Sequence, residues 1–352
     1  MNTRSPRMPV AVIGIGAVGR MHAQRLLDHP ALTLAGVAEP TPGGRDRAAA
    51  WGVPWAADAA DLLDRVRPAA VIVATPNATH AAVGLACIER GLPLLVEKPI
   101  ADTLDQGLAL VQAAAARRVP LLVGHQRRHN PILREAHRLV QAGVLGRPVA
   151  AHGIATWLKP DAYFDAVWRR SPGGGPVLIN LIHDVDLLRH LLGEVVQVQA
   201  LTSNAVRGFE VEDTAALLLR FANGALATLL TSDCTPAPWN WDLAAGEAAH
   251  YPRQAVDSHQ VCGTEASLGL PSLDLWRYRG ARGWHEPLTR ERTTLHAGDP
   301  YQLQLTHLRA VAEGREPPLC SGLDGLRTLQ ATLAVHEAAA SGRAVDLSPL
   351  QP

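Results

Sequence analysis

The stretch that decides the fold is VAVIGIGAVGRMHAQRLLD, residues 10–28. An apolar run leads into three glycines, Gly14, Gly16 and Gly19, in the spacing G-x-G-x-x-G, and a helical pattern follows. Such a turn is typical of dinucleotide-binding domains. Its first glycine allows a tight turn, its second lets the backbone approach a pyrophosphate, and its third lets the helix pack on the strand. Free N–H groups at the helix start favour phosphates. The predicted dinucleotide contacts are Gly14, Ile15, Gly16, Ala17, Val18 and Gly19.

The rest of the first 125 residues repeats this strand-and-helix rhythm. The apolar runs lie at 32–39, 69–75, 93–97 and 120–124, and the helical patterns at 78–90 and 103–118. Strands that are apolar throughout and separated by helices indicate a parallel sheet covered on both faces. We therefore expect a doubly wound α/β fold, with a Rossmann domain over residues 1–125.

The pattern changes after residue 125, and we place a second domain over residues 126–352. Longer alternating runs indicate a mainly antiparallel sheet with a few helices. Asn223-Gly224, between two such runs, predicts a hairpin. The segment 236–260, rich in Pro, Gly, Ala and Trp, is interpreted as a long loop. Helices over about 301–342 are expected to pack back near the first domain.

Composition narrows the class of protein. The chain of 352 residues is 47% hydrophobic, and its 33 basic and 33 acidic residues cancel. A zero net charge argues against a nucleic-acid or anionic-membrane partner. The four cysteines are widely spaced without a C-x-x-C, which favours a reducing cytoplasm over a disulfide or zinc framework. No apolar window is long enough to span a membrane, and the glycine-broken start argues against a secretory signal.

Polar residues follow several of the predicted strands, where ligands of open α/β sheets bind. Glu39, twenty residues beyond Gly19, is placed to bind the ribose hydroxyls, and its charge favours NAD over NADP, although Arg45 lies nearby. The next strand ends predict further cofactor contacts from Ala74, Thr75, Pro76, Asn77, His80, Glu97 and Lys98.

The stretch GGGPVLINLIHDVDLLRHLLG, residues 173–193, combines a glycine-rich approach with a helical pattern that starts at Pro176. At 100° per residue, the core face consists of Leu181, Val185, Leu188 and Leu192. Asn180 and His183 fall on the opposite side, where they face either a cleft or open solvent. A zinc site at His183, Asp186 and His190 is the competing hypothesis, but no cysteine or glutamate completes a ligand set, so we predict no metal.

The motifs GIGAVG, ATPNATH, LLVEKPIADT, GHQRRHNP, GGGPVLINLIHDVDLL and GREPPLCSGLDGLR occur in the order and approximate spacing of the Gfo/Idh/MocA oxidoreductases, which the chain resembles over residues 9–346. The resemblance implies a Rossmann domain and a C-terminal α/β domain with a large open sheet that often forms oligomer interfaces. It also implies reversible hydride transfer between NAD(P) and an alcohol carbon of a sugar, polyol or cyclic diol.

The resemblance also assigns roles to residues. The family's Glu-Lys-Pro lysine, which contacts cofactor and substrate, maps onto Lys98, and its often cis Lys-Pro peptide maps onto Lys98–Pro99. Its catalytic histidine maps onto His183, but Ile179 stands where the family has aspartate. Asn180, three residues before His183, is left to position a substrate hydroxyl or the imidazole. Position in the family implies further cofactor contacts from Gln126, Trp168 and Arg169, and substrate contacts from Lys98, Gln126, Arg127, Thr156, Trp157, Asn180 and His183.

The function we expect is NAD-dependent oxidation or reduction at a CH–OH group, with His183 as base and Lys98 polarising the substrate oxygen. The cations Arg127, Lys159 and Arg169 would suit a carboxylated substrate, and Trp239 and Trp241 could stack on a ring. Two alternatives stay open: a catalytically silent NAD-binding regulatory protein, and a reductase of an imine or enone. A homodimer or homotetramer through the second domain's sheet is expected.

Overall fold

The computed structural model describes residues 6–248, 250–296 and 298–351, and within these the chain forms two compact units. The first contains the described residues up to His129, together with Asp299–Leu329 and the residues from Leu350. The second contains Asn130–Gly298 and Gln330–Pro349. Residues 126–129 thus belong to the first unit, and the C-terminal helical segment is divided between the units at Leu329.

The first unit has the predicted doubly wound α/β fold. Its six strands lie in the order β3-β2-β1-β4-β5-β6, and every pair is parallel. This is the strand order of dinucleotide-binding folds. The strands are β1 (Met8–Ile13), β2 (Leu32–Ala38), β3 (Trp55–Ala56), β4 (Ala70–Val73), β5 (Leu94–Val96) and β6 (Leu121–Val123). Strands β4, β5 and β6 are buried along their whole length, because helices cover both faces of the sheet.

The helices of the first unit follow the predicted amphipathic segments. They are α1 (Ala17–Asp28), α2 (Gly43–Trp51), α3 (Ala59–Val66), α4 (His80–Glu89), α5 (Leu104–Arg117) and α9 (Pro300–Ala312), with short 3-10 helices at Asn77–Thr79 and Gln126–His129. The side chains of Asp58 and Thr103 cap α3 and α5, because each accepts a hydrogen bond from the N–H of the third residue of its helix.

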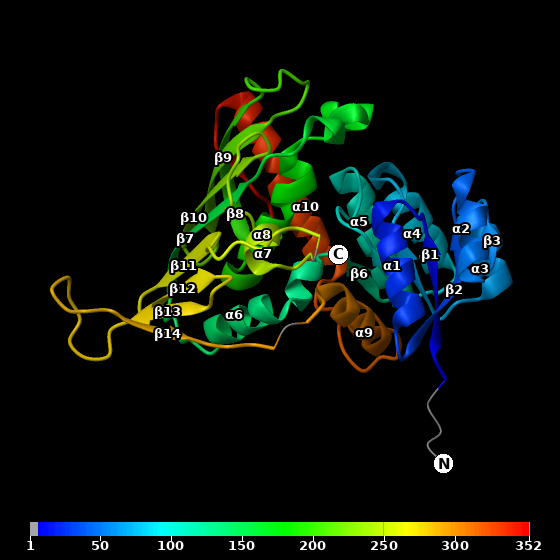
Figure 1. The fold of residues 1–352 in the computed structure, drawn as a ribbon, viewed down its shortest axis with the longest axis horizontal. Coiled ribbons are helices and arrows are strands. Elements are labelled where there is room, and N and C mark those ends of the chain that lie inside the picture. Colours follow the sequence, from blue (N-terminus) through cyan, green and yellow to red (C-terminus); the bar gives the residue numbers. More distant parts are fainter. Residues whose placement is uncertain (1–5, 249, 297, 352) are drawn as a thin grey trace, which may run out of the picture. The chain divides into compact units, whose positions relative to one another are not determined.

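The second unit is built on a nine-stranded sheet with the order β14-β13-β12-β11-β7-β10-β9-β8-β15 (Figure 1). All pairs are antiparallel except β7 with β10, so the predicted mainly antiparallel sheet is confirmed. The strands are β7 (Pro148–Thr156), β8 (Val195–Ser203), β9 (Thr214–Phe221), β10 (Leu226–Ser232), β11 (His259–Gly263), β12 (Ala266–Leu270), β13 (Asp274–Arg277), β14 (Thr289–Arg292) and β15 (Val345–Asp346).

Helices pack on one face of this sheet and form the core of the second unit with it. The helical elements are α6 (Pro131–Gln141), α7 (Ile182–Leu192), α8 (Trp241–Ala245) and the part of α10 (Gly322–Ser341) from Gln330 onward, with 3-10 helices at Asp161–Asp165 and Val167–Arg170. The predicted core positions of α7 are confirmed, because Val185, Leu188 and Leu192 are buried, as is Leu181, which directly precedes α7. On the other face of the sheet, alternate residues of β9 and β10 are exposed.

Two local expectations need correction. The segment 236–260 is more than a loop, since it contains α8 and the start of β11, with the side chain of Asn240 capping α8. The helix expected from Pro176 does not begin with regular α turns: Val177–Leu181 form a π-helix that continues into α7. The 100° spacing therefore applies only from Ile182 onward.

The Asn223-Gly224 hairpin between β9 and β10 is confirmed, and Gly224 has φ 89°.

No helix in the described part of the chain is both long and apolar enough to cross a bilayer.

Candidate active site

The glycine turn has the backbone geometry that the spacing predicts. Gly14 has φ 83°, and a Cβ there would lie 2.6 Å from the carbonyl oxygen of Ala74. A Cβ on Gly19 would overlap the carbonyl group of Gly14, so only glycine lets α1 pack this closely on the turn. A Cβ on Gly16, in contrast, would meet nothing within 4 Å. The open side of the turn at Gly16 is therefore where a pyrophosphate can approach the backbone.

The carboxylate of Glu39 is tied to this turn. Glu39 follows β2, is buried, and accepts hydrogen bonds from the N–H of Ile15 at 2.8 Å and of Thr41 at 3.1 Å. Burial acts to raise the pKa of Glu39, but these N–H donors and Arg47 outweigh it and leave the pKa below its usual value. Glu39 therefore carries its charge at neutral pH beside the turn, which disfavours a 2′-phosphate.

The predicted strand-end loops are joined to one another by His80. Its imidazole is buried, with Nδ1 2.8 Å from the carbonyl oxygen of Pro99 and Nε2 2.8 Å from that of Thr75. Burial lowers the pKa of His80, against the two carbonyl groups, which act to raise it. His80 thus connects the loop after β4 to the loop that carries Lys98.

Glu97 and Lys98 follow β5 and differ in their exposure. Glu97 is buried, and its Oε1 lies 2.7 Å from Nε2 of His22 on α1. A Cβ on Gly124 would overlap the Glu97 carboxylate, so that glycine makes room for it. The pKa of Glu97 lies below its usual value because His22 and Lys98 outweigh the opposing effect of burial. The Lys98 side chain is half-buried, and its peptide bond to Pro99 is cis, as the family resemblance implied.

Gln126 and Arg127, also predicted to contact ligands, lie in the 3-10 helix that Gly124 and His125 separate from β6. Both side chains are buried, with exposed fractions of 5% and 4%. They lie at the carboxyl end of the parallel sheet, where ligands of such folds bind.

In the second unit, Asn180 and His183 lie at the junction of the π-helix and α7. Both are half-buried, as is Ile179, while the neighbouring positions Leu181 and Ile182 are buried. The N-terminal end of the π-helix is fixed by Glu212, whose Oε1 accepts the N–H of Val177 at 2.9 Å. No sequence signal pointed to Glu212, which lies just before β9.

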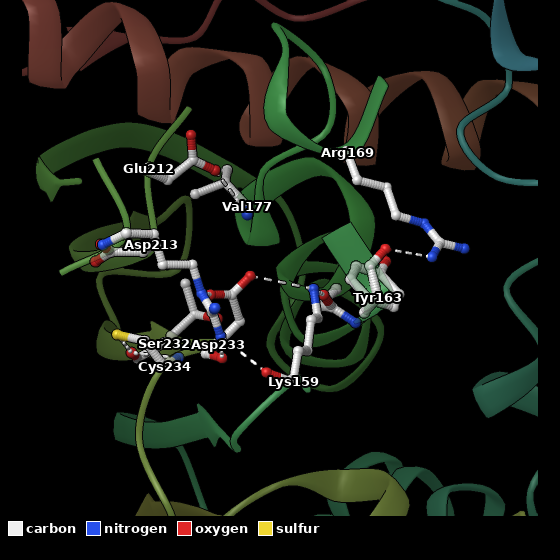
Figure 2. Close-up of polar contacts among 12 residues, drawn as sticks. Lys159, Tyr163, Arg169, Val177, Glu212, Asp213, Ser232, Asp233 and Cys234 are labelled. Carbon is white, nitrogen blue, oxygen red and sulfur yellow. Dashed lines mark hydrogen bonds and ion pairs between the residues drawn. The ribbon is translucent and has the colours of Figure 1, made fainter. Parts of the chain in front are cut away.

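The side chain of Lys159 contacts Asn180. Lys159 follows β7 and is buried, and its Nζ lies 2.7 Å from Oδ1 of Asn180 and 3.4 Å from Oδ2 of Asp233. Arg207 shares Asp233, with Nε 2.9 Å from Oδ1, and also donates to the carbonyl oxygen of Lys159 at 2.9 Å. Figure 2 shows Lys159 with Asp233 on one side and Tyr163 on the other. We call Lys159, Asn180, Arg207 and Asp233 the polar cluster.

Sequence analysis singled out Lys159 and Asn180 but not Arg207 or Asp233. Asp233 follows the last residue of β10, so a strand-end criterion of the kind applied to the first domain would have found it. Arg207 lies in the connection between β8 and β9 and carries no such signal.

Other predicted residues lie around this part of the second unit. The Arg169 guanidinium lies 3.8 Å from the ring centre of Tyr163 and 5.2 Å from that of Trp168, which is exposed. Thr156 is buried at the end of β7, where its N–H donates to the carbonyl oxygen of Trp239. Half-buried Trp157 packs edge-on against Tyr251. Of the two loop tryptophans, Trp239 is exposed and Trp241 is fully buried, so Trp241 is a core residue and cannot stack on a ligand.

The polar residues farther along α7 contact other residues of the protein. Asp184 and Asp186 are buried, and Asp184 Oδ1 lies 3.2 Å from Nε2 of the equally buried His259. The ring of His190 stacks on that of His137, with 4.1 Å between ring centres. In the part of the chain that is described, no set of three His, Cys, Asp or Glu side chains is arranged to hold a metal ion.

Comparison with known proteins agrees with both folds. Residues 8–125 match the family described as "Oxidoreductase family, NAD-binding Rossmann fold", and residues 133–268 match "GFO/IDH/MocA C-terminal domain". The 1,5-anhydro-D-fructose reductase of Ensifer adhaerens is 30% identical over 79% of this chain and 79% of its own. The scyllo-inositol 2-dehydrogenase (NAD(+)) of Bacillus subtilis (strain 168) is 26% identical over 96% of this chain and 95% of its own.

Among solved structures, the WlbA dehydrogenase from Chromobactrium violaceum, in complex with NADH and UDP-GlcNAcA, superposes with a TM-score of 0.80. It is 25% identical, and the match covers 100% of both chains. Family models match both domains of the chain, and the reductase of Ensifer adhaerens is 30% identical over 79% of it. The chain therefore belongs to the Gfo/Idh/MocA family of oxidoreductases, and its first unit is an NAD-binding Rossmann domain.

Proposed function

We propose that the protein is an NAD-dependent dehydrogenase or reductase in which His183 and Lys98 act on one substrate CH–OH group. The observation that carries the proposal is the local setting of His183: a half-buried imidazole on α7, three residues after an asparagine whose amide is held by a buried lysine. A neutral imidazole accepts a hydroxyl proton near neutral pH, as the base of such a reaction must.

The chain's residues divide the chemistry between them. His183 removes the proton from the alcohol oxygen, and the Lys98 ammonium donates to that oxygen and stabilises the negative charge that develops on it. Bound NAD supplies the acceptor for the hydride that leaves the carbon. In the reverse direction, His183 returns the proton to the oxygen.

The cofactor fits the glycine turn, because the Gly16 backbone is open to approach and Glu39 is charged beside it. We propose that NAD contacts the turn and the strand-end loops, with His80 and Glu97 holding those loops in place. The proposed contact residues are Gly14, Ile15, Gly16, Ala17, Val18, Gly19, Glu39, Ala74, Thr75, Pro76, Asn77, Lys98, Gln126, Trp168 and Arg169. The proposed substrate residues are Lys98, Gln126, Arg127, Thr156, Trp157, Asn180 and His183.

The test is a spectrophotometric screen for NADH formation with inositols, 1,5-anhydrosugars, sugars, sugar acids and cis-dihydrodiols, followed by two variants. His183→Ala and Lys98→Met are each expected to lower turnover by about 10²- to 10⁴-fold while NAD still binds in calorimetry. Arg134→Ala, at an exposed position of α6, is the control and is expected to keep full activity. Wild-type turnover in both site variants would overturn the roles. NAD binding without reduction by any compound would favour the silent regulatory protein.

We also propose that the protein is a homo-oligomer through the open face of its large sheet. Leu201, Leu218, Leu226 and Leu230 are exposed on β8, β9 and β10, and Leu201 and Leu230 both pair with Ala216 of β9. Large apolar side chains gathered on an exposed sheet face mark an interaction surface. Sedimentation velocity tests the proposal: Leu218→Glu with Leu230→Glu is expected to give monomers, and an unchanged sedimentation coefficient would refute it.

For location we propose a reducing cytoplasm. The four cysteines are free, and burial raises the pKa of Cys87 to about 12, which disfavours its reactive thiolate form. Fractionation of cells that express the tagged protein tests the location.

A further inference from the structure

The chain contains only two lysines, Lys98 and Lys159, among its 33 basic residues. All of its other residues in that count are arginines. An ammonium differs from a guanidinium in being compact, with three donors that can point at separate acceptors. Lys159 uses this property, since its buried Nζ lies within hydrogen-bond distance of Asn180 and close to Asp233, with the Tyr163 ring centre 4.8 Å away.

The contact with Lys159 decides which way the Asn180 amide is turned. An ammonium can only donate hydrogen bonds, so the amide atom that faces it at 2.7 Å must be the carbonyl oxygen. The NH₂ group of Asn180 therefore points to the other side of Cγ. Within the described residues, Nδ2 has no hydrogen-bond partner, and the side chain is half-buried.

The surroundings of Lys159 fix its position and lower its pKa below the usual value. Burial lowers the pKa of Lys159 and Asp233 acts against that fall, while Asp233 itself is only 2% exposed and shared with Arg207. Arg207 also lies 3.6 Å from the exposed carboxylate of Asp161, so two carboxylates face the two cations. On the Asn180 side, the Lys159 ammonium contacts the amide directly, and together with the two amide N–H donors it favours an anionic acceptor.

We propose that the Asn180 amide determines substrate specificity by donating to a carboxylate oxygen of the substrate, and that Lys159 is its positioning residue. The inference rests on the proposed function, which places the reacting carbon at His183, three residues farther along. An aspartate in this region would accept hydrogen bonds from the hydroxyl groups of a neutral substrate. The Asn180 oxygen is bound by Lys159, so only its NH₂ group faces outward, and this group can only donate. A substrate carboxylate can accept these hydrogen bonds and has no hydroxyl proton that would be left without an acceptor. The substrate class is a hydroxy acid, such as a sugar acid, and not a neutral polyol.

The experiment compares matched acid and neutral probes on the full-length protein saturated with NAD. The pairs are D-gluconate with D-glucitol and D-glucuronate with D-glucose, measured by NADH formation and by calorimetric binding in the presence of NADH. The wild type is expected to prefer the acid of a pair by at least about tenfold in kcat/KM or in Kd, as the loss of a charged hydrogen bond would produce.

Variants at Asn180 and Lys159 separate a positioning role from a structural one. Asn180→Asp is expected to reverse the preference. Lys159→Met is expected to raise KM for the acid by about tenfold while kcat and the neutral probe change little, because the amide is then free to turn. Arg134→Met, a cation removed from an exposed position of α6, is the control. If Lys159→Met fails to fold by circular dichroism, Asn180→Asp and Asn180→Leu carry the test alone.

Each outcome decides the question. Equal or better handling of the neutral probes by the wild type, or an acid preference that survives Asn180→Asp, overturns the inference, and turnover of neutral probes would still support the proposed function. If no probe is oxidised, the proposed function fails for these compounds. The binding data then decide the inference alone. Binding of the acid that is lost in Asn180→Asp would support the inference, and no binding of the acid to the wild type would overturn it.

Discussion

The carboxylate of Glu212 accepts a hydrogen bond from the backbone N–H of Val177, with 2.9 Å between Oε1 and N. Val177 opens the π-helix that presents Asn180 and leads into α7. The other oxygen of Glu212 lies 3.3 Å from Nε2 of His336 on α10. The buried carboxylate of Glu212 thus satisfies a free N–H at the start of the helix that carries His183, although Glu212 is far from His183 in sequence.

Removing this carboxylate is expected to weaken both stability and activity. Glu212→Ala leaves the Val177 N–H without its acceptor and is expected to lower the free energy of unfolding by about 1 kcal/mol, the usual effect of losing a helix cap. Because the first turn then loosens, kcat is expected to fall as well. Urea unfolding and steady-state kinetics measure the two effects. Glu212→Gln keeps an acceptor oxygen and is the control, with a smaller loss of both.

The Glu212 carboxylate also gives stability a pH dependence. Burial acts to raise the pKa of Glu212, but His336 and the Val177 N–H outweigh it, and the folded-state pKa lies below the usual 4.5. A lowered folded pKa means that the carboxylate stabilises the fold fully above the unfolded pKa, and that this contribution is lost as pH falls through the folded value. The stability difference between wild type and Glu212→Gln is therefore expected to shrink on acidification. A difference that grows below pH 4.5 would contradict this.

Two glycines of the dinucleotide turn are expected to respond differently to the same substitution. Gly19→Ala places a Cβ into the Gly14 carbonyl group and is expected to destabilise the first unit by about 1–3 kcal/mol, as overpacking does. Gly16→Ala meets no protein atom within 4 Å, so the melting temperature should hold while the Kd for NAD rises about tenfold or more. Thermal unfolding and calorimetry measure both. Equal melting temperatures for the two variants would contradict the packing argument.

Glu39 is expected to control the choice between NAD and NADP. Its charged carboxylate lies 2.8 Å from the Ile15 N–H, beside the glycine turn, where it repels a 2′-phosphate. Glu39→Ala is expected to raise the ratio of kcat/KM for NADP over NAD by about tenfold, and to weaken NAD binding. Glu89→Ala, an exposed acidic residue at the end of α4, is the matched control. An unchanged ratio in Glu39→Ala would show that selectivity arises elsewhere.

The buried pair of Asp184 and His259 is expected to be structural, although Asp184 is next to His183. Its oxygen lies 3.2 Å from Nε2 of His259, and both side chains are at most 1% exposed. Asp184→Ala removes the carboxylate nearest this buried imidazole and is expected to lower the free energy of unfolding by about 1–3 kcal/mol, the usual effect of leaving a buried polar group unsatisfied. Chemical denaturation measures this, with Asp46→Ala at an exposed position of α2 as the control. A variant that kept its stability but lost activity would instead place Asp184 in the catalytic machinery.

Sequence patterns predicted the first unit well because its signals are local. The glycine turn, the apolar strands and the polar strand ends are contiguous stretches, and parallel strands must bring their carboxyl ends to one edge. The helical face of Leu181, Val185, Leu188 and Leu192 was predicted correctly for the same reason. The π-helix was not predicted, because regular 3.6-residue periodicity was assumed through a turn that Glu212 holds from outside the segment.

By itself, the sequence determined the dinucleotide-binding fold, the family and the positions of Lys98 and His183. Only the tertiary structure decided what stands beside Asn180. The parallel pairing of β7 with β10 sets Thr156 opposite Ser232, and so brings Lys159 and Asp233, which follow these strands, to the same end of the sheet. No periodicity or spacing encodes that contact, because 74 residues separate the partners and the pairing depends on how the whole sheet assembles.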